Sequence, residues 1–227
     1  MSVASAPLGW EPVAFSEIEP FPCAVLARHY PQVPNLGDMT QYATWPDFHI
    51  DLLAGGTPCQ AFSIAGLREG LSDPRGRLML TYAEIAARYR PRWVVWENVP
   101  GVFSSDGGRD FAAFLGLLSG RKVDVPGDGW KNSGVVPGIP DAYGLSWRVF
   151  DAQFTRVESH PFAVPQRRRR VFVVGHLGDW RRAAAVFAER ESLCGNSQPR
   201  RTPGKTVAGT FSARTSGGGG GFVAQRT

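Results

Sequence analysis

The sequence contains little cysteine and no long apolar run, and both absences restrict the class of protein. Its 227 residues include only three cysteines, Cys23, Cys59 and Cys194, which lie far apart and form no CxxC pair. This spacing argues against a disulfide scaffold or a zinc cluster and is typical of a reducing cytoplasm. No apolar run approaches the roughly 18 residues of a membrane span, and residues 1–10 show no secretory signal pattern. We therefore expect a cytoplasmic protein without a metal centre.

Lysine is scarce as well. The formal net charge of +5 comes almost entirely from arginine, because lysine occurs only at Lys122, Lys131 and Lys205. The planar guanidinium group suits bidentate contacts with phosphates and base edges, so nucleic acid is a permitted partner. A compositional preference for arginine explains the same numbers equally well.

Strand-like and helix-like segments alternate along most of the chain. Short apolar runs predict strands at 11–16, 48–54, 93–96 and 171–175, and helical spacing predicts helices at 21–29, 77–89 and 111–118. This alternation predicts an α/β fold with a mostly parallel sheet and flanking helices. Residues 119–144 are rich in Gly and Pro and predict a long surface loop, after which regular structure resumes at 145–154. From residue 200 onward, Gly, Ser, Thr and Arg predict a poorly ordered tail or an element that does not complete.

Polar or reactive residues follow three of the expected strands. Glu17 follows the first, Cys59 lies just after the second, and Glu97 and Asn98 end the third. Ligands of open parallel sheets bind beyond the carboxyl ends of the strands. The sequence therefore predicts a functional site at this edge of the sheet.

Cys59 lies in the segment Gly55-Gly56-Thr57-Pro58-Cys59-Gln60. The glycines leave the backbone room for a ligand, and nearby backbone amides favour the thiolate, which is the nucleophilic form of cysteine. A single cysteine more often fills a turn as a small apolar residue. The two preceding glycines favour the nucleophile here.

Two charged segments border apolar strands. Glu97 ends a very apolar strand, where partial desolvation favours the protonated form that can donate to a ring nitrogen; a strand-end acid that caps the next segment is the structural alternative. The run Arg167–Arg170 leads directly into an apolar strand. Such runs are usually solvated, but alternation along a strand would place Arg168 and Arg170 on one face, aimed at an anion or a carbonyl oxygen.

Together these segments resemble the cytosine-5 DNA methyltransferase family over roughly residues 9–177. Three segments are similar, in order, to the nucleophile, Glu-Asn-Val and Gln-x-Arg-x-Arg motifs of that family: Pro58-Cys59-Gln60, Glu97-Asn98-Val99 and Gln166-Arg167-Arg168-Arg169-Arg170. Three more resemble its second and third motifs and the segment after the nucleophile: Ser16-Glu17-Ile18-Glu19, Gly37-Asp38-Met39-Thr40 and Asp73-Pro74-Arg75-Gly76-Arg77-Leu78.

The resemblance implies a Rossmann-like fold and methyl transfer from S-adenosylmethionine to C5 of cytosine in double-stranded DNA. Cys59 would add to C6 of a flipped base, and Glu97 would protonate or hydrogen-bond N3. Asn98, Arg168 and Arg170 would hold the base and the cysteine segment. The residues implied in S-adenosylmethionine binding are Glu17, Ile18, Asp38, Met39, Pro58 and Leu78.

The sequence departs from the family at both ends. The first motif, an aromatic-rich strand with a Phe-x-Gly-x-Gly turn, is absent, and the chain stops before the last two motifs. We therefore expect an incomplete fold, with a partial catalytic domain at 1–178 and a linker and truncated target-recognition region at 179–227. A misassigned gene start and stop, a degenerate copy such as one in a phage or prophage, or a partner that supplies the missing parts would each explain this; without such a partner, a monomer is expected.

Three other functions stay open at this point. An inactive nucleic-acid-binding remnant would keep the motifs without turnover, and a tRNA cytosine-5 methyltransferase would share them. A thiol hydrolase built on Cys59 would need a histidine partner, but His29, His49, His160 and His176 lie in no recognisable motif. A restriction-modification, phage-protection or regulatory role stays equally open.

Overall fold

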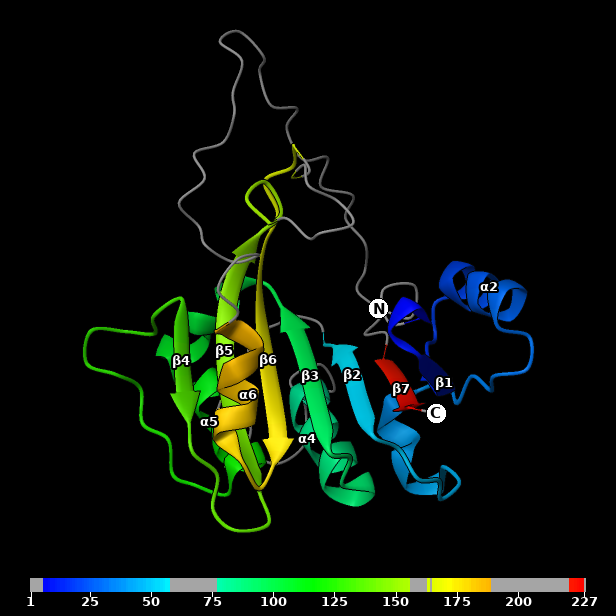
Figure 1. Ribbon diagram of the computed structural model, residues 1–227, viewed down its shortest axis with the longest axis horizontal. Helices are drawn as coiled ribbons and strands as arrows, with labels where there is room; N and C mark the ends of the chain where they lie inside the picture. Colours follow the sequence, from blue (N-terminus) through cyan, green and yellow to red (C-terminus); the bar gives the residue numbers. More distant parts are fainter. Residues whose placement is uncertain (1–5, 58–76, 156–162, 164, 189–220, 227) are drawn as a thin grey trace, which may run out of the picture.

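The computed structural model describes residues 6–57, 77–155, 163, 165–188 and 221–226 (Figure 1). Its strands are β1 (Trp10–Ser16), β2 (Leu52–Gly56), β3 (Trp93–Asn98), β4 (Ser133–Val136), β5 (Tyr143–Asp151), β6 (Arg169–Leu177) and β7 (Gly221–Arg226). Its α-helices are α2 (Pro20–His29), α4 (Arg77–Tyr89), α5 (Arg109–Ser119) and α6 (Trp180–Phe187). Four short 3-10 helices are η1 (Ala6–Leu8), η2 (Met39–Thr44), η3 (Pro100–Phe103) and η4 (Ser105–Gly108).

The strands form one seven-stranded sheet in the order β1-β7-β2-β3-β6-β5-β4. The α/β prediction is confirmed, but the sheet is mixed rather than mostly parallel. Among the described pairs only β2 and β3 are parallel, because β6 and β5 form an antiparallel ladder beside β3 and β7 runs opposite to both of its neighbours. It follows from these pairings that β1, β2 and β3 still point the same way. Their carboxyl ends therefore meet at one edge of the sheet, as the site prediction requires.

Residues 221–226 differ from the predicted poorly ordered tail, of which residues 200–220 lie outside the described residues. Residues 221–226 form β7, which lies between β1 and β2 and pairs with both. The apolar residues Phe222, Val223 and Ala224 provide the strand signal, which the preceding glycine run obscures. Helix α6, also beyond the boundary predicted at residue 178, packs against β5 and β6. β7 thus joins the same sheet as β1 and β2, and α6 covers β5 and β6 of that sheet.

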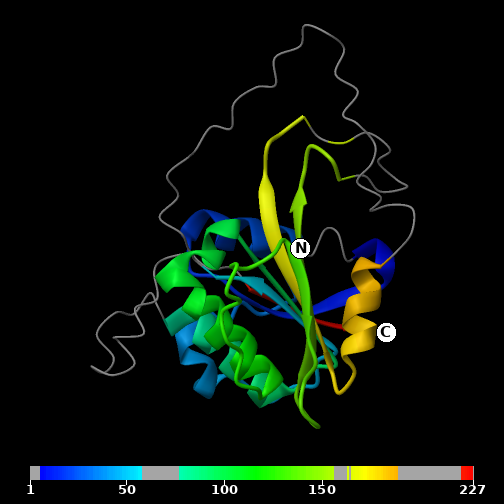
Figure 2. The same ribbon diagram turned by 90° about the vertical axis from the view of Figure 1, so that its left-hand side faces the viewer.

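The main core lies between the sheet and helices α4 and α5, with α6 on the opposite face (Figure 2). Alternation along β3 turns Val94, Trp96 and Asn98 into this core, where they are buried. Trp96 is fully buried, and its ring centroid lies 4.5 Å from that of Phe114 on α5. Helix α4 ends before Arg90, which has a φ of 47° and precedes a proline. The α4 and α5 predictions are therefore confirmed, and packing on the sheet explains their apolar faces.

The Gly- and Pro-rich stretch at 119–144 is only partly a loop. Within it, Ser133–Val136 forms β4, an edge strand whose Val136 pairs with Leu145 of β5. Gly134 allows this pairing, because a Cβ there would lie 2.2 Å from the Trp147 ring. The strand has four residues, of which only two are apolar, so the sequence shows no alternation of apolar and polar residues there. The prediction missed the strand for that reason.

Candidate active site

Glu97 and Arg170 meet at the carboxyl end of β3. The antiparallel register of β3 and β6 pairs Asn98 with Val171, which brings the residue before each into diagonal reach. Arg170 Nε lies 2.8 Å from Glu97 Oε1, and the two side chains are 24% and 27% exposed. Both side chains are therefore largely shielded from solvent, and the Glu97 carboxylate is held in one orientation by a charge-assisted hydrogen bond.

Gly56 lies beside the same carboxylate. The parallel pairing of β2 and β3 places Gly56 directly opposite Glu97. A Cβ on Gly56 would lie 3.0 Å from Glu97 Oε2 and 3.2 Å from its carbonyl oxygen. Glycine therefore lets the carboxylate lie across the end of β2 in this position, whereas a Cβ would require it to shift by a few tenths of an ångström.

Thr57, directly before Pro58 and Cys59, is fixed by two residues of β3. Asn98 Nδ2 donates to the Thr57 carbonyl oxygen at 2.9 Å, and Trp96 Nε1 donates to Thr57 Oγ1 at 3.1 Å. The Asn98 amide oxygen accepts from the backbone N–H of Val99 at 2.8 Å, which fixes the amide orientation. The predicted residues Cys59 and Pro58 themselves lie outside the described residues.

Arg168 is not part of the Glu97–Arg170 pair. It precedes β6, so the expected strand alternation with Arg170 does not apply to it. Its backbone N–H donates to Asp151 Oδ1 at 3.2 Å, and its side chain is exposed. Of the two arginines predicted to act together, the structure brings one to the carboxylate.

Two acids lie where the chain leaves β1 and enters η2. Glu17 Oε1 accepts from the backbone N–H groups of Ile18 and Glu19 at 2.8 and 2.9 Å. Asp38 Oδ1 caps η2 by accepting from the N–H of Thr40 at 2.9 Å. Each side chain thus has a fixed orientation, and these contacts engage only one oxygen of each carboxylate.

Asn35 joins the Glu17 segment to the Asp38 segment. Its amide accepts from the backbone N–H of Glu17 at 3.0 Å and donates to the Glu17 carbonyl at 2.9 Å. Asn35 Oδ1 also accepts from the backbone N–H of Gly37 at 3.2 Å, and Ser16 Oγ donates to the Gly37 carbonyl at 2.7 Å. The two predicted cofactor acids are therefore carried by segments that are hydrogen-bonded to each other.

An apolar pocket opens beside these segments. It is lined by Ser16, Met39, Trp45, Leu53, Ala54, Gly55, Gly56, Tyr82 and Ile85. The Tyr82 hydroxyl lies within hydrogen-bonding distance of the Leu53 and Val95 carbonyls, and burial raises the pKa of Tyr82 well above its usual value. Met39, a predicted cofactor residue, contributes directly to the pocket, and Leu78 lies half-buried on α4.

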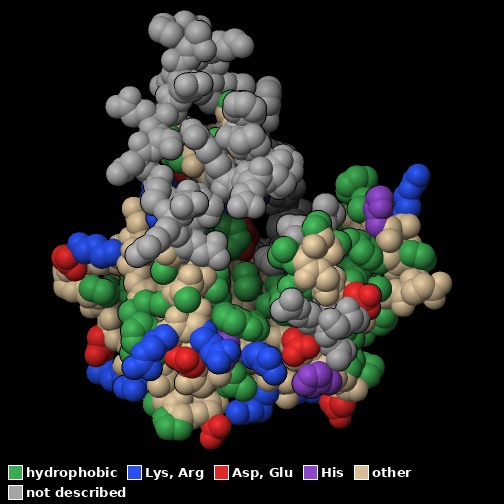
Figure 3. All heavy atoms as spheres, viewed as in Figure 1, with side chains coloured by type: hydrophobic (Ala, Val, Ile, Leu, Met, Phe, Trp, Pro, Cys, Tyr) green, Lys and Arg blue, Asp and Glu red, His purple; other side chains and the backbone are tan. Residues whose placement is uncertain are grey.

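Ile18, the remaining predicted cofactor residue, is accessible. It is 56% exposed, and the neighbouring Phe21 and Val25 of α2 are 79% and 41% exposed. Figure 3, viewed as Figure 1, shows hydrophobic side chains at the surface around α2. An apolar ligand surface could approach Ile18 without any rearrangement of the described residues.

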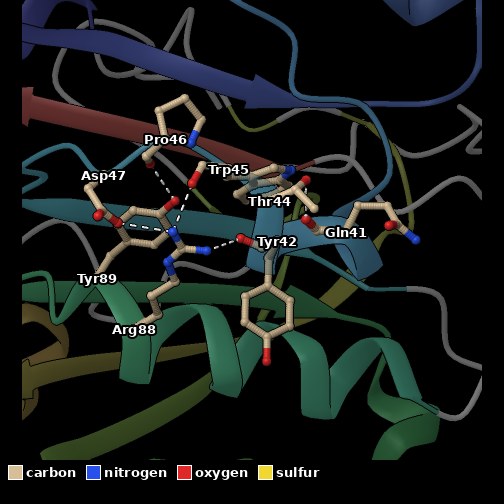
Figure 4. A network of polar contacts seen from close by, with 8 residues as sticks. All are labelled: Gln41, Tyr42, Thr44, Trp45, Pro46, Asp47, Arg88 and Tyr89. Atoms are coloured by element: carbon tan, nitrogen blue, oxygen red, sulfur yellow. Dashed lines mark hydrogen bonds and ion pairs between the residues drawn. The ribbon is translucent and has the colours of Figure 1, made fainter.

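Arg88 holds the segment between η2 and β2 against α4 (Figure 4). Its guanidinium donates to the carbonyls of Tyr42 and Trp45, the latter at 2.8 Å, and to Asp47 Oδ1 at 3.0 Å. The hydroxyl of the next residue, Tyr89, donates to the Pro46 carbonyl at 2.8 Å. These contacts fix the segment that carries Trp45 and Met39 into the pocket.

The described residues contain no group of three or more His, Cys, Asp or Glu side chains arranged to hold a metal ion. Among the described helices, none has the length and apolar character needed to cross a membrane.

The family model for C-5 cytosine-specific DNA methylases matches residues 1–120, more than half of the chain. The chain belongs to the C-5 cytosine-specific DNA methylase family. The family prediction made from the motifs is confirmed.

Several relatives are similar over most of this chain. The DNA N-6-adenine-methyltransferase of Escherichia phage P1 is 43% identical over 234 residues, which cover 88% of this chain and 30% of that protein. The type II methyltransferase M.AquIA of Picosynechococcus is 31% identical over 185 residues, covering 78% of this chain and 67% of that protein. M.NgoBV of Neisseria gonorrhoeae is 35% identical over 169 residues, covering 74% and 35%. The chain thus spans about a third of the phage P1 and Neisseria proteins and two thirds of M.AquIA.

Solved structures are less similar. A DNA modification methyltransferase encoded within an E. coli prophage aligns with a TM-score of 0.47 and 19% identity, covering 71% of this chain and 39% of that one.

Motif reading identified the charged groups of the site but missed the residues that hold them. Thr57 and Trp96 are adjacent to predicted site residues, yet neither belongs to a charged or nucleophilic class. Asn35 and Arg88 lie in segments without a motif, and only their contacts reveal their roles. A buried tryptophan next to the predicted catalytic acid was the one available signal, because a buried indole N–H needs an acceptor.

Proposed function

We propose that this chain carries the catalytic core of a DNA cytosine-5 methyltransferase that acts through a covalent Cys59 adduct on a flipped cytosine. The observation that carries the proposal is the Glu97–Arg170 ion pair, 2.8 Å long, at the end of β3. Trp96 of the same strand donates a hydrogen bond to Thr57. The acid thereby lies one strand away from the segment that leads to Cys59, and the guanidinium contacts it from the next strand, β6.

The chemistry assigns a distinct task to each residue. C5 of cytosine is a poor nucleophile until the Cys59 thiolate adds to C6 and makes C5 electron-rich. Glu97, in its protonated form, donates a hydrogen bond or a proton to N3, which stabilises the charge that the addition creates. After C5 has been methylated, loss of the C5 proton to water and elimination of the thiolate restore the aromatic ring. Arg170 orients the Glu97 side chain through their contact.

The residues at the end of β1 and in η2 fit the adenosine part of S-adenosylmethionine. The fixed carboxylates of Glu17 and Asp38 suit ribose hydroxyls and the adenine amine, both of which are hydrogen-bond donors. Ile18, Met39 and Leu78 provide apolar surface for the ring. When bound, S-adenosylmethionine supplies the methyl group as a reactive sulfonium.

Covalent trapping tests the proposal directly. Duplex DNA containing 5-fluorocytosine lacks the C5 proton that must leave, so the Cys59–C6 bond should persist and retard the protein on a denaturing gel. We expect the wild-type chain to form this adduct in the presence of S-adenosylmethionine, Cys59→Ser to form none, and Cys194→Ser to behave as wild type. An adduct in Cys59→Ser would contradict the assigned nucleophile. A wild-type chain that forms no adduct and shows no heat of S-adenosylmethionine binding would support the inactive remnant.

One relative favours a second candidate reaction. The similar phage P1 protein is named for adenine N6 methylation, and its identity of 43% is higher than that of the two type II methyltransferases described above, at 31% and 35%. The match covers only 30% of that protein, so that activity could belong to its remaining part. Adenine N6 attacks a sulfonium without a thiol adduct, which would leave the nucleophile segment without a purpose. Mass spectrometry of nucleosides from methylated DNA and tRNA separates 5-methylcytosine from N6-methyladenine and DNA from RNA as substrate.

A further inference from the structure

We infer that Trp96 and Thr57 form a positioning pair, in which the indole N–H fixes the point where the chain enters the Cys59 segment. This inference rests on the proposed function, because it assigns a purpose to the pair only if Cys59 is the nucleophile. Trp96 Nε1 lies 3.1 Å from Thr57 Oγ1, and the two residues are 0% and 7% exposed. Thr57 is two residues before Cys59, so a change in its position is passed on through one proline.

The pair is part of a two-point attachment. Trp96 holds the Thr57 hydroxyl, and Asn98 holds the Thr57 carbonyl at 2.9 Å. A single contact would leave Thr57 free to rotate about that contact. Two contacts, one to its side chain and one to its backbone, fix both its position and its orientation.

The attachment also couples the thiol segment to the acid. Side chains alternate along β3, so Trp96 and Asn98 point to one face and Glu97 to the other. The residues on both sides of the acid therefore hold Thr57, and any shift of β3 moves Glu97 and the start of the Cys59 segment together. Reaction rates depend steeply on such relative placement.

The donor in this pair is itself immobile. The Trp96 ring packs against Phe114 and Phe111 of α5, with centroid separations of 4.5 and 6.4 Å. A buried indole N–H without an acceptor is unfavourable, so the indole favours the one position of Thr57 that satisfies it. The α5 helix thus supports the nucleophile segment through Trp96.

The test uses Thr57→Val, which replaces the hydroxyl with a methyl group of similar size, and Thr57→Ser, which restores it. Ser146→Ala is the matched control, because it removes another buried hydroxyl hydrogen bond, to the Gly134 carbonyl on β4, away from the site. We expect Thr57→Val to slow adduct formation on 5-fluorocytosine DNA about 10-fold, scaled from a loss of about 100-fold per ångström, with unchanged DNA affinity. Thr57→Ser should stay within about 2-fold of wild type on the same scale. Equal rates for Thr57→Val and wild type, or an equal loss in Thr57→Ser, would overturn the inference.

A second measurement keeps this test separate from that of the proposed function. The rate of Cys59 alkylation by iodoacetamide, followed by peptide mass spectrometry with Cys23 as internal reference, requires neither DNA nor turnover. If the wild-type chain forms no adduct, the proposed function fails, but the pair still predicts that Thr57→Val changes the Cys59 alkylation rate and its pH profile. Thr57→Ser and Ser146→Ala should leave both unchanged. An unchanged profile in Thr57→Val would refute the pair.

Discussion

Replacing Gly56 with alanine would displace the Glu97 carboxylate without removing any charged group. The new Cβ would lie 3.0 Å from Glu97 Oε2, whereas ordinary contacts begin at 3.4 Å, so the carboxylate must move by a few tenths of an ångström. A displacement of about 1 Å can cost roughly 100-fold in rate, which scales to a loss of about 3- to 10-fold here. Gly56 has no positive φ, so the backbone accepts alanine. The substitution should then change the free energy of unfolding by no more than about 1 kcal/mol.

Adduct formation on 5-fluorocytosine DNA measures this loss, and urea unfolding measures the stability. Gly127→Ala is the matched control, because a Cβ there meets nothing within 4 Å and the backbone is equally ordinary. We expect Gly127→Ala to keep the wild-type rate. A Gly56→Ala variant with the wild-type rate would refute the claim that carboxylate placement limits the reaction. A loss of stability above about 2 kcal/mol would instead show that the strand, rather than the carboxylate, gives way.

Two further predictions concern the scaffold. Arg88→Met keeps the apolar stem but removes the guanidinium that donates to three acceptors, so amide hydrogen exchange in residues 42–47 should accelerate and the melting temperature should fall; Arg28→Met, at an exposed position on α2, should change neither. Burial, together with Arg182 and Arg92, lowers the pKa of His176, which packs edge-on against Trp93. The unfolded chain then binds a proton more readily, so the free energy of unfolding should be highest above about pH 6.5 and should fall as the pH drops below it. His176→Phe should flatten this dependence between pH 7 and 5 in urea titrations, whereas a His29→Phe variant that flattened it equally would refute the assignment.

The fold was predictable where elements carry their own period. The helix predicted at 77–89 has the same bounds as the observed α4, because its apolar face and the Arg90-Pro91 pair that follows are both local signals. Strand direction has no such local signal. The antiparallel β5–β6 ladder depends on which strand edges meet in space, and β7 pairs with strands about 170 to 210 residues earlier in the chain. A mostly parallel sheet was therefore the wrong extrapolation from a correct set of elements.

The site was predictable to the level of charged groups. The motif order indicated Glu97 and Arg170 in advance, and the structure brings them together. Arg168 shows the limit of that reasoning, since its supposed alternation with Arg170 assumed that the strand began before residue 169. The roles of Glu17, Asp38 and Met39 in cofactor binding stay predictions, although the contacts through Asn35 explain how residues 21 positions apart reach one edge.

The six residues of β3 combine core packing and chemistry by alternation alone. Trp96 and Asn98 are at most 5% exposed and support Thr57, whereas Glu97 between them is 27% exposed and contacts Arg170. Partly exposed ion pairs contribute only about 0–1 kcal/mol to stability, while the loss of a buried tryptophan costs about 3–5 kcal/mol. Glu97 can therefore be selected for chemistry with little effect on folding, but its two neighbours cannot be changed without affecting both. That asymmetry explains how one strand can carry a fixed acid, here the proposed catalytic one: the residues on either side of it are also residues that the core needs.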